Sequence, residues 1–514
     1  MAVADEDDVC TIVWRSIGRP TLRYCVGRST TIVEQLMPPA ETRLEHDLLG
    51  DREVPAAAYY GIHTLRAGEN FRISGIAMST YPDLVNALAA VKQAAAAANR
   101  DLCLLPADKA AAIIKACEEV RSGELHEQFV VDVIQGGAGT SANMNANEVI
   151  ANRALEHLGH ARGEYAFLHP LDDVNMGQST NDVYPTAVKV ALHWAADRLL
   201  DAMGILRGAF AAKADELMSV VKVGRTQLQD AVPMTLGQEF AAYAVMIGED
   251  ERRLAEACRL IEEVNLGGTA IGTRLNAPPR YCEFACSYLD ELTGIPLVIS
   301  PNLIEATQDP GSFVQFSGVL KRIAVKLSKI CNDLRLLSSG PRAGLGEINL
   351  PPMQAGSSIM PGKVNPVIPE VVNQIAFEVI GNDVTVSFAA EAGQLQLNAF
   401  EPIIAHSLFM SVTHLEMGCR TLAERCVAGI TANVDHLRSQ VEASIGLVTA
   451  LNPIIGHAQA TAVAQEAAAT GRSVPEVVVS RGLVSKEHLD ELLSPETLAG
   501  LPAQPDPPGC EPGP

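Results

Sequence analysis

Aromatic residues are scarce in this sequence and make up only 4% of its 514 residues. A large β-sandwich would need more of them, whereas hydrophobic residues reach 47% and alanine is abundant, which favours close-packed helices. Because charged residues make up only 19%, the chain has enough apolar material for a large core and is not an intrinsically disordered protein. Its length corresponds to about three domains.

Positive charge is also in short supply. The 39 Lys and Arg residues are outnumbered by 61 Asp and Glu residues, which gives a formal net charge of −22. Such a surface repels phosphate backbones and anionic lipid headgroups, so nucleic acid and membranes are not expected partners. A small anionic substrate is still compatible with this charge, because the field inside a site can oppose the net charge. No apolar run is long enough to span a bilayer.

Cysteine pairs with the spacing of metal ligands are missing. The eleven cysteines are scattered without a CxxC motif, and the closest pair, Cys282 and Cys286, fits one face of a helix. We therefore expect buried free thiols in a reducing compartment. The N-terminus begins with the acidic run at residues 5–8, which has the wrong charge for a secretory signal, so a cytoplasmic protein is expected.

The two ends of the chain differ from its middle. Residues 1–42 show no sustained hydrophobic period and are expected to form a poorly ordered extension, with Met37 as a plausible true start. Six prolines between residues 502 and 514 predict a disordered tail over residues 501–514, because proline cannot sustain a helix.

Long helical patterns dominate the middle of the chain. Apolar residues recur at helical spacing over 188–217 after a start signal at Pro185 and Thr186, over 236–261 until Gly267 and Gly268, and over 316–337. Two further amphipathic stretches cover roughly 368–395 and 400–428. Because these helices exceed the usual globular length and carry wide apolar stripes, they predict a mainly all-α protein with a long helix bundle shared between subunits.

Two polar segments interrupt the pattern before long helices. Residues 136–145 combine glycines with Thr140 and predict either a helix-capping loop or close backbone approach to a ligand. Residues 178–182 contain Ser179, Thr180 and Asn181, which suit helix capping and carboxylate binding at a helix start equally well.

Two more polar segments follow. Residues 224–230, with Thr226 and Gln227, again allow either capping or anion binding. Residues 356–366 are not a phosphate-binding loop. Such a loop has four residues between its first glycine and Gly-Lys, followed by Ser or Thr, whereas here five residues separate Gly356 from Gly362-Lys363 and Val364 follows. Here Ser357 could act as a base only with N–H donors or a cation near its oxyanion, and Lys363 could clamp a carboxylate. A flexible linker is the alternative.

Together, in this order, the four segments resemble the aspartase/fumarase superfamily over about residues 43–498. Residues 356–370 match its signature GSSxMPxKxNxxxxE at every fixed position. Residues 224–240, 47–50, 59–64 and 341–344 resemble the aspartase branch, whereas fumarases usually carry histidine where Gln227 stands.

The resemblance implies an all-α homotetramer with three domains per chain, at residues 43–177, 178–430 and 431–500, and active sites built from three subunits. It implies deamination of L-aspartate to fumarate and ammonia through an enediolate, with no cofactor and no metal. Ser357 would be the general base that removes the Cβ proton. The residues implied in substrate binding are Thr140, Ser179, Thr180 and Ser358 for the β-carboxylate, Thr226, Lys363 and Asn365 for the other carboxylate, Asn181 for the amino group, and Gln227 without a histidine's role.

Alternatives and departures go with this resemblance. The runner-up activity is that of a class II fumarase, and a noncatalytic structural protein is also conceivable because lens crystallins share the fold. Leu171 and Asp173 are unusual in segment 169–175, which puts a secondary anion site there in doubt. Arg274 stands where relatives commonly have glycine, and a positive φ there would be strained by about 1 kcal/mol or more.

Overall fold

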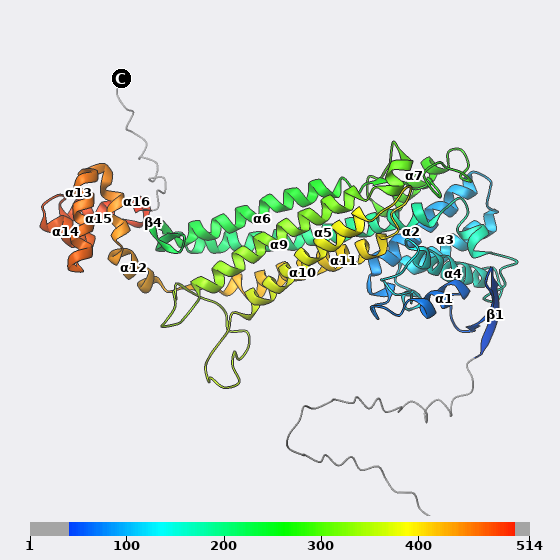
Figure 1. The fold of residues 1–514 in the computed structure, drawn as a ribbon, viewed down its shortest axis with the longest axis horizontal. Coiled ribbons are helices and arrows are strands. Elements are labelled where there is room, and N and C mark those ends of the chain that lie inside the picture. Colours follow the sequence, from blue (N-terminus) through cyan, green and yellow to red (C-terminus); the bar gives the residue numbers. More distant parts are fainter. Residues whose placement is uncertain (1–40, 499–514) are drawn as a thin grey trace, which may run out of the picture.

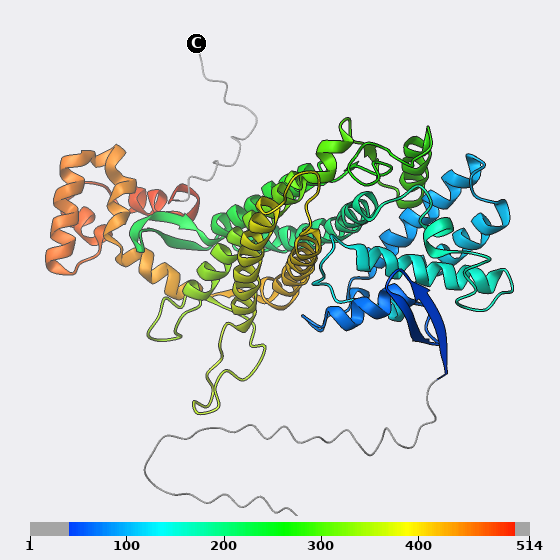
Figure 2. The ribbon, with the colours of Figure 1, turned by 45° about the vertical axis from the view of Figure 1, so that its right-hand side comes forward.

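The computed structural model describes residues 41–498, and the fold is mainly helical, as predicted (Figure 1). Long helices run along the middle of an elongated molecule, and smaller helical parts form its two ends. The blue N-terminal part and the orange C-terminal part lie at opposite ends of the bundle in both views (Figures 1 and 2). The predicted disordered ends, apart from residues 41 and 42, and the proposed start at Met37 lie outside the described residues.

The N-terminal part packs around the alanine-rich helix α2, which is buried along most of its length. Small side chains let neighbouring helix backbones approach closely, and α2 contacts α3, α5 and α7. The elements of this part are β1 (Thr42–Asp47), β2 (Gly50–Pro55), α1 (Ile62–Asn70), α2 (Pro82–Asp101), α3 (Ala107–Arg121), α4 (Thr140–His157) and a π-helical turn at Pro170–Val174.

Five long helices form the central bundle, in which α5 packs on α6 and α11, and α10 packs on α9 and α11. The amphipathic stretches expected in this region are all confirmed as helices. Their bounds are α5 (Thr180–Glu216), α6 (Leu236–Cys258), α9 (Gly311–Leu337), α10 (Val367–Glu391) and α11 (Glu401–Arg425), with α7 (Tyr281–Thr293) and α8 (Leu303–Gln308) beside them.

Two predicted helix boundaries are wrong. Helix α5 begins at Thr180 and contains Pro185, which was expected to start it. Pro185 lacks the N–H that would bond to the carbonyl oxygen of Asn181, and the side chain of Asn265 donates to that oxygen at 3.0 Å instead. A contact from another segment thus replaces the missing helical bond. Helix α6 ends at Cys258, well before the expected stop at Gly267.

The far end of the bundle carries a hairpin and the C-terminal helices, which have their own hydrophobic cluster. The elements of this end are β3 (Val221–Thr226) paired with β4 (Gln229–Thr235), β7 (Ile348–Asn349) with β8 (Thr431–Ala432), and α12 (Val434–Ala443), α13 (Val448–Thr470), α14 (Val474–Ser480), α15 (Lys486–Leu492) and α16 (Pro495–Leu498). The short pair β5 (Glu263–Val264) and β6 (Val298–Ile299) lies at the opposite end of the bundle, beside α7 and the N-terminal part of α5.

Two expectations from composition can be compared with the described part of the chain. Its eight cysteines are all free thiols, and seven of them are buried while Cys103 is exposed. Both Cys282 and Cys286 lie on α7, as their spacing predicted. Among residues 41–498, no helix combines the length and the apolarity that crossing a bilayer requires.

Candidate active site

The first two polar segments meet at the starts of α4 and α5. Thr140 is the first residue of α4 and Thr180 the first residue of α5. The side-chain nitrogen of Asn143 lies 3.0 Å from Thr180 Oγ1, so the two helix starts are in direct contact. Both helices direct the positive ends of their dipoles to this place, which favours an anion.

Ser179 caps α5, so the capping interpretation of its segment is confirmed. Its Oγ accepts a hydrogen bond from the backbone N–H of Asn181 at 3.3 Å, and Asp182 accepts one from the N–H of Ser179 at 3.0 Å. Capping does not exclude ligand binding, because the hydroxyl accepts in this bond and keeps its proton for another partner. The Asn181 amide donates to the carbonyl oxygen of Ala270 at 2.7 Å.

Thr140 is exposed, but its hydroxyl is engaged within its own turn. It donates to the carbonyl oxygen of Gly137 at 2.7 Å. The preceding Gly139 has a φ of 90° and lies under the ring of Tyr184, where a Cβ would approach the ring to 2.4 Å. This glycine is therefore required for the turn that presents Thr140.

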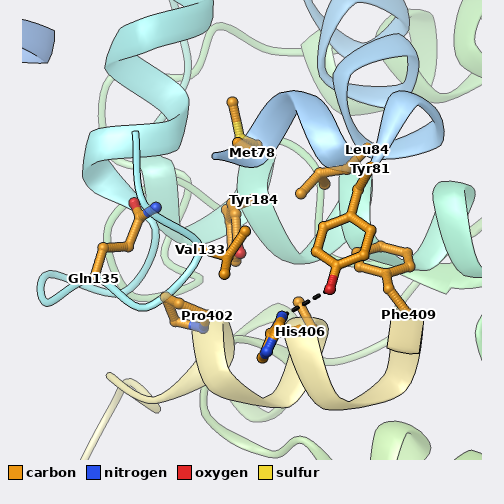
Figure 3. A pocket seen from close by; sticks show the side chains of 10 residues that line it. Met78, Tyr81, Leu84, Val133, Gln135, Tyr184, Pro402, His406 and Phe409 are labelled. Carbon is orange, nitrogen blue, oxygen red and sulfur yellow. Dashed lines mark hydrogen bonds between the residues drawn. The ribbon is translucent and has the colours of Figure 1, made fainter. Parts of the chain in front are cut away.

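A small cavity lies behind this turn, between α11 and the segments that carry Gln135 and Tyr81 (Figure 3). Tyr81 Oη and His406 Nδ1 are 2.7 Å apart across it. Burial lowers the pKa of His406, which favours the neutral imidazole. The cavity has room for about one water molecule, so the surface behind the two helix starts is closely packed.

A cluster of polar side chains lies beneath the helix starts, and we call it the polar floor; its members are Lys92, Asn143, Asn147, Asn175, Gln178 and Asp182. Two of them are buried ionisable residues that sequence reasoning missed as functional candidates. Lys92 and Asp182 are both completely buried. Burial lowers the pKa of Lys92 to about 7 and raises the pKa of Asp182 to about 7. Asp182 also accepts hydrogen bonds from the backbone N–H groups of Gly267 and Thr269, at 3.0 and 2.9 Å. A single lysine inside the alanine-rich stretch 87–98 was the available signal.

The third segment lies at the other end of the bundle. Helix α5 has 37 residues, which at 1.5 Å per residue corresponds to about 55 Å between its ends. Thr226 and Gln227 are exposed at the tip of the β3–β4 hairpin that follows α5. Gln227 and Leu228 form a two-residue turn with φ values of 55° and 62°. Left-handed turns of this kind match the twist of a hairpin but are unusual without glycine or asparagine.

A buried ion cluster anchors this hairpin. Glu347 is completely buried, forms an ion pair with Arg225 and lies 2.8 Å from Lys222 Nζ. A register shift between Val223 and Arg225 in β3 lets both cations face the same carboxylate, since residues three apart on a regular strand face opposite ways. The hairpin is thereby fixed to the residue just before β7.

The fourth segment forms a protruding loop between β7 and α10 (Figure 1). Ser357 Oγ accepts hydrogen bonds from the backbone N–H groups of Ile359 and Met360, at 3.2 and 3.0 Å. The loop is closed at its neck, where the Gly356 N–H donates to the Lys363 carbonyl oxygen at 2.8 Å and the Asn365 amide to the Gly356 carbonyl oxygen at 2.6 Å. Ser358 and the Lys363 side chain are exposed.

Within one chain, the predicted site residues therefore fall into three separate groups. Thr140 and Ser179–Asn181 form one group, and Ser357 with its neighbours forms another on the protruding loop. Thr226 and Gln227 form a third at the end of α5 that lies about 55 Å from the first.

Two of the unusual residues now have a structural setting. Asp173 is paired with Lys109 at 2.8 Å and accepts from the backbone N–H of His169, so this carboxylate already uses a cation and an N–H donor of the segment and adds negative charge to it. Arg274 has a φ of 61°, the left-handed conformation in which a side chain is strained.

Comparisons with known proteins agree on one family. Residues 50–381 match a family profile described as "Lyase", and residues 447–500 match one described as "Fumarase C C-terminus". The aspartate ammonia-lyase of Pseudomonas aeruginosa is 61% identical over 90% of this chain and 98% of its own length. That of Escherichia coli K12 is 56% identical over 89% and 96%.

Solved structures show the same relationship. A structure described as fumarate lyase:delta crystallin from Brucella melitensis superposes with a TM-score of 0.87 and 59% identity, over 89% of this chain and all of that one. The class II fumarase of Schistosoma mansoni gives a TM-score of 0.85 at 34% identity, over 89% of this chain and 99% of its own.

Proposed function

The chain belongs to the lyase family that contains the aspartases and the fumarases, and we propose that it converts L-aspartate reversibly to fumarate and ammonia with Ser357 as the base. It is a carbon–nitrogen lyase whose substrate is a small molecule. Its identity to aspartate ammonia-lyases is 56 to 61%, against 34% for the class II fumarase. Gln227, in place of a fumarase histidine, agrees with that difference.

The observation that carries the proposal for Ser357 is its pair of backbone donors. A serine hydroxyl is a very weak acid, so it can accept a proton from carbon only where its alkoxide form is stabilised. The N–H groups of Ile359 and Met360 both point at Ser357 Oγ. Two such donors favour the negatively charged oxygen, in the way an oxyanion hole favours a tetrahedral intermediate. Closing the protruding loop over the substrate would exclude water and strengthen this effect.

The starts of α4 and α5 suit the carboxylate on which charge accumulates. Removing the Cβ proton of L-aspartate produces an enediolate, and most of the catalysis must come from stabilising it. Thr140, Ser179 and Thr180, together with Ser358 from the loop, would hold this group. For this, Thr140 has to release the carbonyl oxygen of Gly137.

The other end of the substrate would meet the remaining residues. Lys363 and Asn365 from the loop, with Thr226 from the hairpin, would hold the second carboxylate, where the lysine supplies the charge. Asn181 would face the amino group, and Gln227 would supply neutral amide contacts beside it.

We propose a homotetramer in which each site takes residues from three subunits. Groups about 55 Å apart on one chain can contact a single small substrate only if different chains supply them. Helix α10 leaves Phe377, Val384 and Phe388 exposed by 62%, 49% and 71%, and exposed apolar stripes of this kind mark protein interfaces. Packing the bundles of four chains together would cover them.

We further propose the three domains at residues 43–177, 178–430 and 431–500, and a cytoplasmic location. The separate hydrophobic cluster of the C-terminal helices supports the last boundary. The buried free thiols among residues 41–498 support a reducing compartment.

The test follows the ultraviolet absorbance of fumarate with L-aspartate and, separately, with L-malate as the substrate of the full-length protein. We expect fumarate to form from L-aspartate and not from L-malate. Formation from L-malate alone would make the protein a fumarase, and no formation from either substrate would support a noncatalytic role.

A further inference from the structure

Lys92 is a buried lysine whose direct partners are both uncharged. Its side chain is completely buried, and Nζ donates to Asn175 Oδ1 at 2.9 Å and to Gln178 Oε1 at 2.8 Å. Burying an ammonium group without a carboxylate in contact is costly, and helix stability offers no reason for it, since alanine surrounds it on α2. Its position directly under the starts of α4 and α5 points to a role there.

Lys92 fixes how both neighbouring amides are turned, because Nζ carries at least two protons in either protonation state and donates one to each amide oxygen. Asn175 and Gln178 must each present oxygen to Nζ. Their nitrogen atoms then face acceptors: Asn175 Nδ2 donates to the carbonyl oxygen of Gln178 at 3.2 Å, and Gln178 Nε2 donates to that of Val174 at 2.9 Å. The orientation of each amide is therefore determined from both of its sides.

The same oxygen of Asn175 determines the orientation of Asn143. Asn143 Nδ2 lies 3.2 Å from Asn175 Oδ1, and turning the amide over would bring two oxygens together. The Nδ2 group also lies 3.0 Å from Thr180 Oγ1, so it donates there with its second proton. Thr180 accepts in this bond. Among residues 41–498 its own hydroxyl proton has no side-chain acceptor, and its side chain is partly exposed.

We infer that Lys92 is a positioning residue that acts through Asn175 and Asn143 to keep the Thr180 hydroxyl a hydrogen-bond donor toward the substrate carboxylate. The inference rests on the proposed function, in which Thr180 contacts that carboxylate. A donor is what a developing enediolate requires, whereas a hydroxyl turned inward toward Asn143 would present lone pairs to a negative charge. Lys92 itself does not touch the substrate.

A double-mutant cycle tests this chain of hydrogen bonds. The variants are Lys92→Met, Thr180→Val and the two combined, and kcat and KM for L-aspartate are measured for each. We expect each single change to lower kcat/KM by about 10- to 100-fold, the range for one hydrogen bond to a charged group. The double variant should be no worse than Thr180→Val alone, with the same division between kcat and KM, because both changes remove one interaction.

Lys189 offers a matched control. It is also a buried lysine with a neutral partner, and its Nζ donates to the carbonyl oxygen of Glu263 at 2.6 Å outside the amide network. Lys189→Met should leave kcat/KM within about threefold of wild type if the variant is folded and assembled, which thermal unfolding and sedimentation report. Lys92→Gln, which can still donate to one amide, should recover part of the activity.

The outcomes separate this inference from the proposed function. Losses that multiply in the double variant, or an unchanged kcat/KM for folded Lys92→Met, would overturn the role of Lys92 while wild-type deamination stands. If Lys92→Met does not assemble, Asn143→Ala interrupts the same connection, and its cycle with Thr180→Val distinguishes the same two outcomes. A wild-type protein that does not deaminate L-aspartate would refute the proposed function itself.

Discussion

The polar floor under α4 and α5 and the loop at residues 350–366 carry the same kinds of polar side chain, but the floor is buried and densely hydrogen-bonded whereas the loop is exposed. In the floor, the oxygen of Asn175 alone accepts from Lys92, Asn143 and Asn147. On the loop, Ile359 and Met360 are exposed by 83% and 48%, and a few bonds at the neck hold the segment. Under the proposed function, this difference suits a floor that holds a fixed charge distribution and a loop that closes to bring in the base.

The largest expected effect is on the loop side, at Ser357. Ser357→Ala should lower kcat by about 10²–10⁴-fold, the usual contribution of a general base, while substrate binding survives through the other contacts. The melting temperature should not change, since Ser357 Oγ bonds to backbone N–H groups of its own loop. Steady-state kinetics and a separate affinity measurement check this, and near-normal turnover at saturating L-aspartate would eliminate Ser357 as the base.

Lys363 on the same loop should behave differently. Lys363→Ala should raise KM for L-aspartate by about 10- to 100-fold, because a carboxylate loses its charged partner, with a smaller change in kcat. Lys486→Ala, which removes another exposed lysine on α15, is the control and should leave KM unchanged. Equal losses of kcat in Lys363→Ala and Ser357→Ala would show that the two residues cannot be assigned separate roles.

Mixing subunits brings the two regions together from different chains. Thr140→Ala and Lys363→Ala homotetramers should each be weakly active, and mixed tetramers should regain part of the wild-type activity, up to roughly a quarter of the sites. Activity after mixed refolding or co-expression measures this. A mixture no more active than its parents, or sedimentation as a monomer, would contradict sites shared between chains.

A smaller effect is expected at the neck of the loop. A Cβ at Gly356 would lie 2.6 Å from the carbonyl oxygen of Lys363, so Gly356→Ala should open the neck and lower kcat/KM about tenfold with little effect on unfolding. Gly208→Ala on α5, where a Cβ meets nothing, is the control and should be neutral or slightly stabilising. Wild-type kinetics for Gly356→Ala would mean that the neck does not position Ser357.

The smallest effect concerns stability at the start of α11. Burial raises the pKa of Glu401 to about 8, from 4.5 in an exposed carboxyl group. The folded protein therefore binds this proton more tightly than the unfolded chain, and stability is lost as the pH rises between these two values. Glu401→Gln should raise the melting temperature by about 1–2 °C at pH 8.5 and leave it unchanged near pH 4. An equal shift at both pH values would show that charge is not the cause.

The helices of the bundle could be predicted from the sequence because their apolar residues recur at a local spacing. For segment 178–182, capping could likewise be proposed from the sequence, since a cap needs only the next three residues, but carboxylate binding was an equally good interpretation. The true start of α5 could not, because the partner that compensates for Pro185 is Asn265, eighty residues away. Lys92 was missed for the same reason, since its role depends on segments that only the fold brings under Thr180.

Because α5 separates the groups of site residues on one chain, the activity of such an enzyme depends on how much of the protein is present. Under the proposed assembly, no single chain contains all the residues of a site, so the specific activity depends on protein concentration. Dilution below the dissociation constant of the tetramer would abolish turnover while every helix within a subunit stays folded. A cell that makes too little of this protein would lose its activity more steeply than its amount.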